Sequence, residues 1–228
     1  MISDNLHKII NGLPSGVKLV AVSKFHPFEA ILSAYEAGQR CFAESRPQEL
    51  EMKVKQAAEA GKNDIEWHFI GHLQTNKLKM VLPYVSLVQS VDSIHLLDEI
   101  NKWAKDNGQK VDILLEMHIA AEETKQGFCE EEILDIMFAY SDGKYPGVRI
   151  RGLMGMATNT DDKETVSADF ERIDSYMAYL VDLFPELDSF NQLSIGMSGD
   201  YEEALRHGST MVRIGTAIFG NRLSSSYE

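Results

Sequence analysis

Eight short apolar runs, separated by amphipathic segments, constrain the fold of this 228-residue chain more than any other feature. The runs are continuously apolar rather than alternating, which is typical of parallel strands buried on both faces. The predicted strands cover residues 18–22, 40–43, 66–70, 85–89, 111–117, 148–152, 192–195 and 211–214. Strands of this kind, each followed by a helix, predict an α/β protein.

The segments between these strands have the periodicity of helices. Apolar residues between positions 166 and 184 recur at steps of three and four, which places them on one helical face. Ser93 is a favourable N-cap for the helix after the fourth strand, and Asp200 with Glu203 resembles a capping box. Eight strand–helix units predict a single (β/α)8 TIM barrel over residues 1–228, with an open doubly wound sheet as the alternative.

An excess of acidic residues limits the partners of the chain. Its formal net charge is −13 at pH 7, so it repels phosphate backbones and anionic lipid. No apolar run approaches the length of a membrane span, and the N-terminal residues lack the apolar core of a signal peptide. We therefore expect a cytoplasmic protein that binds neither nucleic acid nor membranes. No extra arm or exposed apolar helix is apparent, so we expect a monomer.

The cysteines and two histidines do not form a recognisable metal motif. Cys41 and Cys129 are far apart in the sequence, and we expect both to be reduced. His68 and His72 have a spacing that would suit a metal on a helix, but the segment has the pattern of a strand followed by a loop. We therefore predict no metal site, with His68 packed in the core and His72 lining a pocket.

Active sites of such barrels lie at the C-terminal ends of the strands, which makes Lys24 the first candidate residue. It follows the first predicted strand closely. Burial of its amine would lower the amine pKa, and a neutral amine can attack an aldehyde to form a Schiff base. A lysine that points into water is the alternative.

Two glycine-containing loops follow the seventh and eighth predicted strands, where barrels frequently bind phosphate. The first loop contains Gly196, Met197 and Ser198. The second contains Gly215 and Thr216. Glycine lets backbone amides approach an anion closely, and hydroxyl groups add hydrogen-bond donors. Ordinary turn glycines and a capping serine are the alternative for either loop alone.

Arg213 lies within the last predicted strand and is flanked by apolar residues, so its charge needs a partner. That partner is either a structural carboxylate or the ring nitrogen of a pyridine cofactor. An arginine beside the ring nitrogen keeps its own charge and disfavours protonation of the ring. Met154 and Met197 also lie at strand ends, and we expect them to line the same site.

Five segments carry a resemblance to a known family: residues 19–24, 68–77, 151–154, 195–198 and 208–220. Together they resemble the pyridoxal phosphate homeostasis protein family. That family is itself similar to the N-terminal barrel domain of alanine racemase standing alone. The likeness runs over almost the whole chain, and the segment 208–220 is long and highly specific.

The resemblance implies a cofactor and a role for several residues. Lys24 matches the lysine that holds pyridoxal 5′-phosphate as a Schiff base. Ser198, Gly215 and Thr216 match phosphate-binding positions, and Arg213 matches the arginine that faces the pyridine nitrogen. The implied function is intracellular homeostasis of the cofactor without established catalysis, with direct contact to pyridoxal phosphate-dependent apoenzymes left open.

One position departs from the family pattern. The family usually has Gly-Glu-Asn after the second strand, whereas this chain has Ala43, Glu44 and Ser45. The asparagine side chain would reach the ring hydroxyl of the cofactor, and Ser45 is shorter. The resemblance therefore predicts that this chain retains the cofactor more weakly than relatives with asparagine.

Three other functions remain as alternatives. A pyridoxal phosphate-dependent amino-acid racemase needs acid–base groups on both faces of the substrate carbon. In alanine racemases the second group comes from a separate C-terminal domain, which we do not expect here because the sequence stops shortly after Gly220. An aldolase-like barrel would use Lys24 without a cofactor, and a pure interaction module would not use it at all.

Overall fold

Parallel strands form a closed barrel in the computed structural model, which describes residues 1–122 and 126–221. The strands are β1 (Lys18–Val22), β2 (Cys41–Glu44), β3 (Glu66–Phe69), β4 (Leu87–Val91), β5 (Val111–Glu116), β6 (Val148–Met154), β7 (Gln192–Ser194) and β8 (Met211–Ile214). Each strand pairs with the next, and β8 also pairs with β1, for example through Val212 and Leu19. The predicted TIM barrel is confirmed, and the open doubly wound alternative is wrong.

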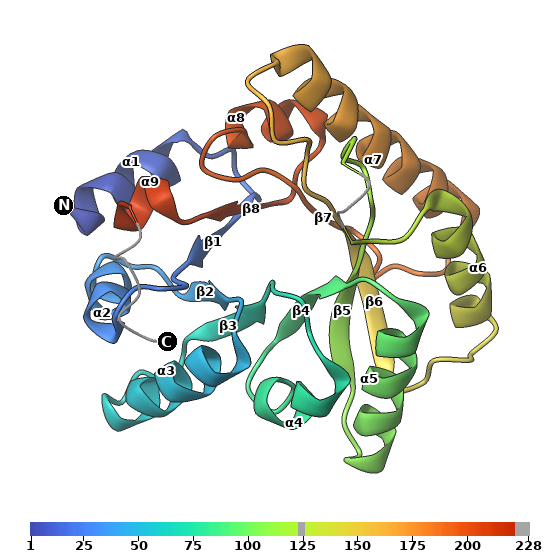
Figure 1. Cartoon of the computed structure of the whole chain (residues 1–228), viewed down its shortest axis with the longest axis horizontal. Helices are drawn as coiled ribbons and strands as arrows, with labels where there is room; N and C mark the ends of the chain where they lie inside the picture. The colour runs from blue at the N-terminus through green and yellow to red at the C-terminus, as the bar shows by residue number, and fades with distance from the viewer. Residues whose placement is uncertain (123–125, 222–228) are drawn as a thin grey trace.

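Helices surround the barrel and lie outside its wall (Figure 1). The α-helices are α1 (Ile2–Gly12), α2 (Phe28–Glu36), α3 (Pro47–Glu59), α4 (Leu78–Val81), α5 (Ile94–Asp106), α6 (Glu130–Ser141), α7 (Lys163–Leu183), α8 (Tyr201–Ala204) and α9 (Thr216–Phe219). Two 3-10 helices are η1 (Thr75–Lys77) and η2 (Leu205–His207). Within the described ranges, no helix is long and apolar enough to cross a membrane.

Strand bounds agree closely with the prediction except that β6 ends two residues later than predicted and that β4 is shifted. This strand begins and ends two residues later than predicted, because polar side chains at its end find partners within the protein. Gln89 Nε2 lies 2.8 Å from His68 Nδ1, and the Ser90 hydroxyl donates to the carbonyl oxygen of Gly71. Satisfied polar groups can be buried at little cost, so the polar residues do not end the strand.

The helix caps confirm one prediction and correct another. The Ser93 hydroxyl accepts a hydrogen bond from the backbone N–H of Leu96 at 3.3 Å, as an N-cap should. The predicted capping box of Asp200 and Glu203 is wrong. The Asp200 carboxylate accepts a hydrogen bond from the backbone N–H of Met197 instead. The Glu203 carboxylate accepts a hydrogen bond from the hydroxyl of Ser167 in α7. Asp200 thus stabilises the loop before α8.

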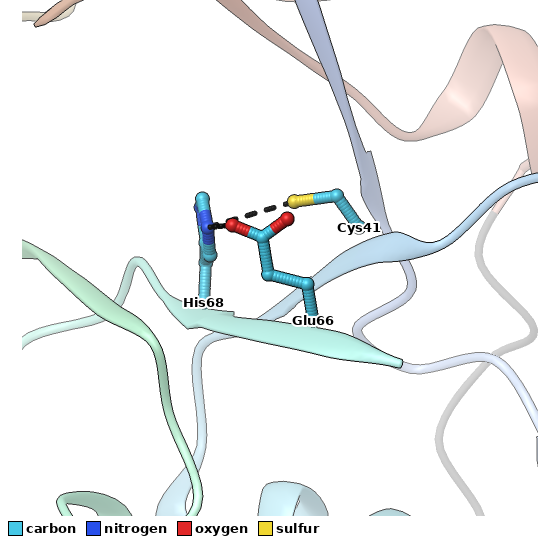
Figure 2. Close-up of side chains that lie close together, drawn as sticks. All are labelled: Cys41, Glu66 and His68. Carbon is cyan, nitrogen blue, oxygen red and sulfur yellow. Dashed lines mark hydrogen bonds and ion pairs between the residues drawn. The ribbon is translucent and has the colours of Figure 1, made fainter. Parts of the chain in front are cut away.

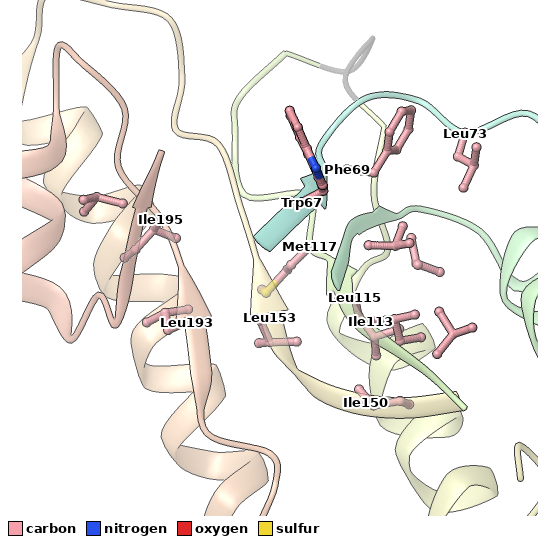
Figure 3. Packing of buried hydrophobic residues seen from close by; sticks show 14 of the residues in the cluster. Trp67, Phe69, Leu73, Ile113, Leu115, Met117, Ile150, Leu153, Leu193 and Ile195 are labelled. Atoms are coloured by element: carbon pink, nitrogen blue, oxygen red, sulfur yellow. The ribbon is translucent and has the colours of Figure 1, made fainter. Parts of the chain in front are cut away.

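Two hydrophobic clusters stabilise the barrel. The larger cluster joins strands to helices, and Figure 3 shows part of it, with side chains from β3, β5, β6 and β7. The smaller cluster consists of Val20, Val22, Cys41, Ala43, Leu87, Leu114, Met154 and Met211. Neighbouring residues of β1 alternate between the two clusters, because successive side chains of a strand point to opposite faces. The smaller cluster therefore fills the barrel interior.

Candidate cofactor-binding site

The predicted site residues all lie at or near the C-terminal ends of strands, where barrels of this kind place their sites. Lys24 and Ser45 follow β1 and β2, whose ends are neighbours because Val22 pairs with Ala43. The others follow or end β3, β6, β7 and β8: His72, Met154, Met197, Ser198, Arg213, Gly215 and Thr216. One mouth of the barrel therefore gathers residues that are far apart in the sequence.

Lys24 is half-buried in a turn that two carboxylates hold in place. The hydroxyl of Ser23, which is fully buried, donates to Glu44 Oε1 at 2.6 Å. The backbone N–H of Phe25 donates to Glu49 Oε1 at 2.7 Å. Phe25 has a φ of 66°, a left-handed conformation that is uncommon for a bulky residue. The backbone on both sides of the lysine is therefore fixed by buried polar contacts.

The ammonium group of Lys53 joins these contacts into one cluster. It lies 2.7 Å from a carboxylate oxygen of Glu44 and 2.7 Å from one of Glu49, and it donates to the Ser23 carbonyl oxygen at 2.8 Å. The side chains of Lys53 and Glu44 have no exposed surface. Burial raises the pKa of Glu44 to about 7, and the charge of Lys53 acts in the opposite direction. The cluster gives Lys24 a rigid support.

Ser198 connects the loops after β7 and β8. Its hydroxyl oxygen accepts hydrogen bonds from the backbone N–H groups of Gly215 and Ala217, each at 3.3 Å. A Cβ atom at Gly215 would lie 3.0 Å from the carbonyl oxygen of Val22, so the glycine lets this loop approach β1. Amides and a hydroxyl that converge in this way suit a phosphate group. Thr216, the first residue of α9, is exposed beside them.

Arg213 is buried and held by neutral oxygen atoms. Its guanidinium group donates to the carbonyl and hydroxyl oxygens of Ser194 at 2.7 and 2.8 Å and to the carbonyl oxygen of Gly155 at 3.0 Å. Burial lowers the pKa of Arg213 to about 10, whereas the nearby Glu116 raises it, so the group stays charged at neutral pH. These contacts fix the plane of the guanidinium group. Among the described residues, no carboxylate is in direct contact with it.

Glu116 adds a titrating group to the same mouth of the barrel. Burial and the nearby Asp92 raise its pKa to about 7, whereas Arg213 and His72 act in the opposite direction. His72 itself is more than half exposed, and its Nδ1 lies 2.9 Å from a carboxylate oxygen of Asp92. The site therefore combines a permanent cation with a carboxyl group that changes charge near neutral pH.

The remaining candidate residues differ in burial. Met154 is buried in the interior cluster, so it supports the site from below, whereas Met197 is exposed. Ser45 is half-buried, and its backbone lies against Gly71. A Cβ atom at Gly71 would lie 2.1 Å from the Ser45 carbonyl oxygen, so only glycine allows this close approach. The ends of β2 and β3 are therefore tightly packed.

Sequence reasoning missed the buried ion cluster and Glu116. Lys53 lies three residues after Leu50 and four before Ala57, and both of these residues are buried in α3. Helical periodicity alone would have placed the lysine on the buried face, where a charge requires a partner. No comparable pattern in the sequence distinguishes Glu116 from other strand-end carboxylates.

Comparisons with known proteins match most of the chain. The sequence profile of the alanine racemase N-terminal domain matches residues 1–222. A pyridoxal phosphate homeostasis protein of Vibrio alginolyticus is 40% identical over 210 residues, which cover 92% of this chain and 88% of that protein. One of Aquifex aeolicus is 39% identical over 210 residues and covers 90% and 87%.

A solved structure gives the same result at the level of the fold. The structure of PipY from Synechococcus elongatus with pyridoxal phosphate bound has a TM-score of 0.85 to this chain and 32% sequence identity. The alignment covers 96% of this chain and all of that one. The chain therefore belongs to the alanine racemase N-terminal domain family and, within it, to the pyridoxal phosphate homeostasis proteins.

Proposed function

We propose that this protein binds pyridoxal 5′-phosphate as a Schiff base on Lys24 and serves in the homeostasis of that cofactor. The observation that carries the proposal is the convergence of three features at one mouth of the barrel. They are the anchored turn at Lys24, the Ser198 hydroxyl with the backbone amides that meet it, and the buried Arg213. The names of the related proteins and the cofactor in PipY support the same assignment.

The residues present fit the cofactor group by group. The amides of Gly215 and Ala217, with the Ser198 hydroxyl, offer donors for the phosphate. Arg213, charged at neutral pH, offers a donor to the ring nitrogen. Lys24 supplies the amine that bonds the aldehyde carbon, with water as the leaving product. When bound, the cofactor would supply an electrophilic carbon that other amines can attack reversibly.

We further propose that the protein carries or buffers the cofactor rather than catalysing amino-acid turnover. The names of the related homeostasis proteins support this proposal. Arg213 disfavours the ring protonation that makes the cofactor a strong electron sink, although alanine racemase itself tolerates such an arginine. The alternative of a racemase predicts turnover of free amino acids. The proposal includes a cytoplasmic, monomeric, single-domain protein of residues 1–228 that supplies pyridoxal phosphate-dependent apoenzymes.

A titration with pyridoxal phosphate tests the proposal. The wild type and a Lys55→Ala control, altered at an exposed lysine of α3, should gain a visible absorption band that survives dialysis. Lys24→Ala should gain none that survives. A colourless wild type would contradict the assignment. Racemisation of alanine by the loaded protein, at a rate comparable to that of a racemase, would contradict the non-catalytic role.

A further inference from the structure

Three potential metal ligands meet at the N-terminal mouth of the barrel, the end opposite to Lys24. Cys41 begins β2 and Glu66 begins β3, and the two residues are paired in register. His68 follows two residues later on β3, so it points to the same side as Glu66. Figure 2 shows the thiol, the carboxylate and the imidazole turned toward one another. Their ligand atoms all lie within 4.8 Å of one another.

We propose that Cys41, Glu66 and His68 form a binding site for a divalent zinc ion. Sulfur, imidazole nitrogen and carboxylate oxygen are the protein ligands that zinc prefers. Three such ligands leave a fourth position for water or for a small ligand. A cavity of about 470 Å³ borders Cys41 and Glu66, and it gives an ion a path from solvent to the site.

Two of the three distances between ligand atoms are close to those of a tetrahedral zinc site. Zinc–sulfur and zinc–nitrogen bonds of about 2.3 and 2.05 Å at the tetrahedral angle place the two atoms about 3.6 Å apart. The observed distance from Cys41 Sγ to His68 Nε2 is 3.6 Å. The same construction gives about 3.4 Å between nitrogen and oxygen ligands. His68 Nε2 lies 3.1 Å from Glu66 Oε1, so small side-chain movements suffice to admit an ion.

The charge of Glu66 already suits a metal, whereas His68 must move a proton and Cys41 must lose one. Burial lowers the pKa of His68. Its Nε2–H donates to Glu66, so this hydrogen must move to Nδ1 before Nε2 can bind a metal. The hydrogen bond from His68 lowers the pKa of Glu66 to about 2, with Lys18 acting in the same direction, so the carboxylate is ionised. Burial raises the pKa of Cys41, so its thiol must lose its proton to solvent as the sulfur–zinc bond forms. Binding should therefore release about one proton per ion and strengthen as pH rises.

Two neighbouring side chains complete the site. Lys18 Nζ lies 2.7 Å from Glu66 Oε1 and supplies the cation that this carboxylate pairs with when no metal is present. Because Lys18 is partly exposed, it can swing into solvent, and its charge opposes the metal. Gln89 lies against His68 Nδ1 at 2.8 Å. A half-turn of the Gln89 amide would present its oxygen to the Nδ1–H that metal binding at Nε2 requires, and it would break the hydrogen bond that this oxygen accepts from the Ser194 hydroxyl at 2.6 Å.

The test is a zinc titration of the purified full-length chain in competition with a coloured zinc indicator. The wild type should take up about one equivalent. Cys41→Ser and Glu66→Gln should bind at least about 100-fold more weakly, since even loss of a residue that only orients a metal ligand costs about 10–100-fold. Cys129→Ser, which removes an exposed cysteine at the start of α6, is the matched control and should bind like the wild type. Lys18→Met should bind more tightly.

Several results would overturn the proposal. These are a wild type that takes no zinc from the indicator, equal affinities for the wild type and Glu66→Gln, or equal losses in Cys129→Ser and Cys41→Ser. Glu66 is partly exposed, so its substitution remains informative if Cys41→Ser fails to fold. Proton release measured in the same titration gives a second readout, and binding without release would exclude the thiolate as a ligand.

Discussion

Replacement of Lys53 with methionine tests whether the buried ion cluster supports the turn at Lys24. Methionine keeps much of the apolar volume but removes the ammonium group that contacts Ser23, Glu44 and Glu49 at 2.7–2.8 Å. Glu44 then remains fully buried, with the Ser23 hydroxyl still donating to it. Removal of one partner from a buried ion pair costs about 3–5 kcal/mol. We expect Lys53→Met to lower the free energy of unfolding by that amount.

The loss of stability should depend on pH in a specific direction. Burial already raises the pKa of Glu44 to about 7, and loss of the Lys53 cation raises it further. A protonated Glu44 carries no charge and needs no cation. The difference in unfolding free energy between Lys53→Met and the wild type should therefore be smaller at about pH 5 than at about pH 8.

Urea-induced unfolding followed by circular dichroism at the two pH values measures both effects. Lys55→Met is the matched control, because Lys55 lies on the same helix and pairs with Glu51 at the exposed surface. It should unfold like the wild type. Lys53→Met should also lose pyridoxal phosphate faster on dialysis, since the turn at Lys24 is less well anchored. A loss below about 1 kcal/mol, or one independent of pH, would refute the reasoning.

Three further predictions concern the site. Ser45→Asn should slow the loss of pyridoxal phosphate on dialysis, because the longer amide reaches further toward the ring; an unchanged rate would exclude this role. Ser198→Ala should weaken cofactor binding by about tenfold, the value of one hydrogen bond to a charged group, in an absorbance titration. An unchanged affinity would place the phosphate elsewhere. Glu116→Gln should alter the pH dependence of stability. The raised pKa of about 7 means that Glu116 holds an extra proton in the folded protein between about pH 4.5 and 7. It therefore contributes a fall of about 3 kcal/mol in the unfolding free energy as pH rises through that window, in addition to the contribution of Glu44. Urea unfolding of Glu116→Gln should lack the contribution of Glu116 and keep that of Glu44, and identical pH profiles would show that Glu116 titrates normally.

The barrel was predictable from the sequence because its strands are buried on both faces. Continuous apolar runs predicted β1 and β8 with correct ends, and the helical spacing between positions 166 and 184 predicted α7. The position of β4 was harder to predict, since the polar Ser90 looks like a residue of a loop. Its partner is the carbonyl oxygen of Gly71 in the loop after β3, and no local pattern in the sequence reveals this contact.

The supports of the candidate site depend on tertiary contacts. Lys53 lies in α3, and its ammonium group reaches the end of β1 only because the fold brings α3 and β1 together. Cys41 and His68 likewise meet through the register of β2 against β3, which a sequence without a structure does not specify. Residue types at strand ends were therefore predictable, whereas the groups that hold them in place were not.

Reduction of the pyridoxal phosphate-loaded protein with borohydride, followed by peptide mass mapping, tests the central claim most directly. Borohydride converts a Schiff base into a stable secondary amine, so the reduced cofactor stays on the residue that held it. The account predicts loss of the visible band and the added mass on the peptide that contains Lys24. Added mass on another lysine, or none after loading, would contradict the account.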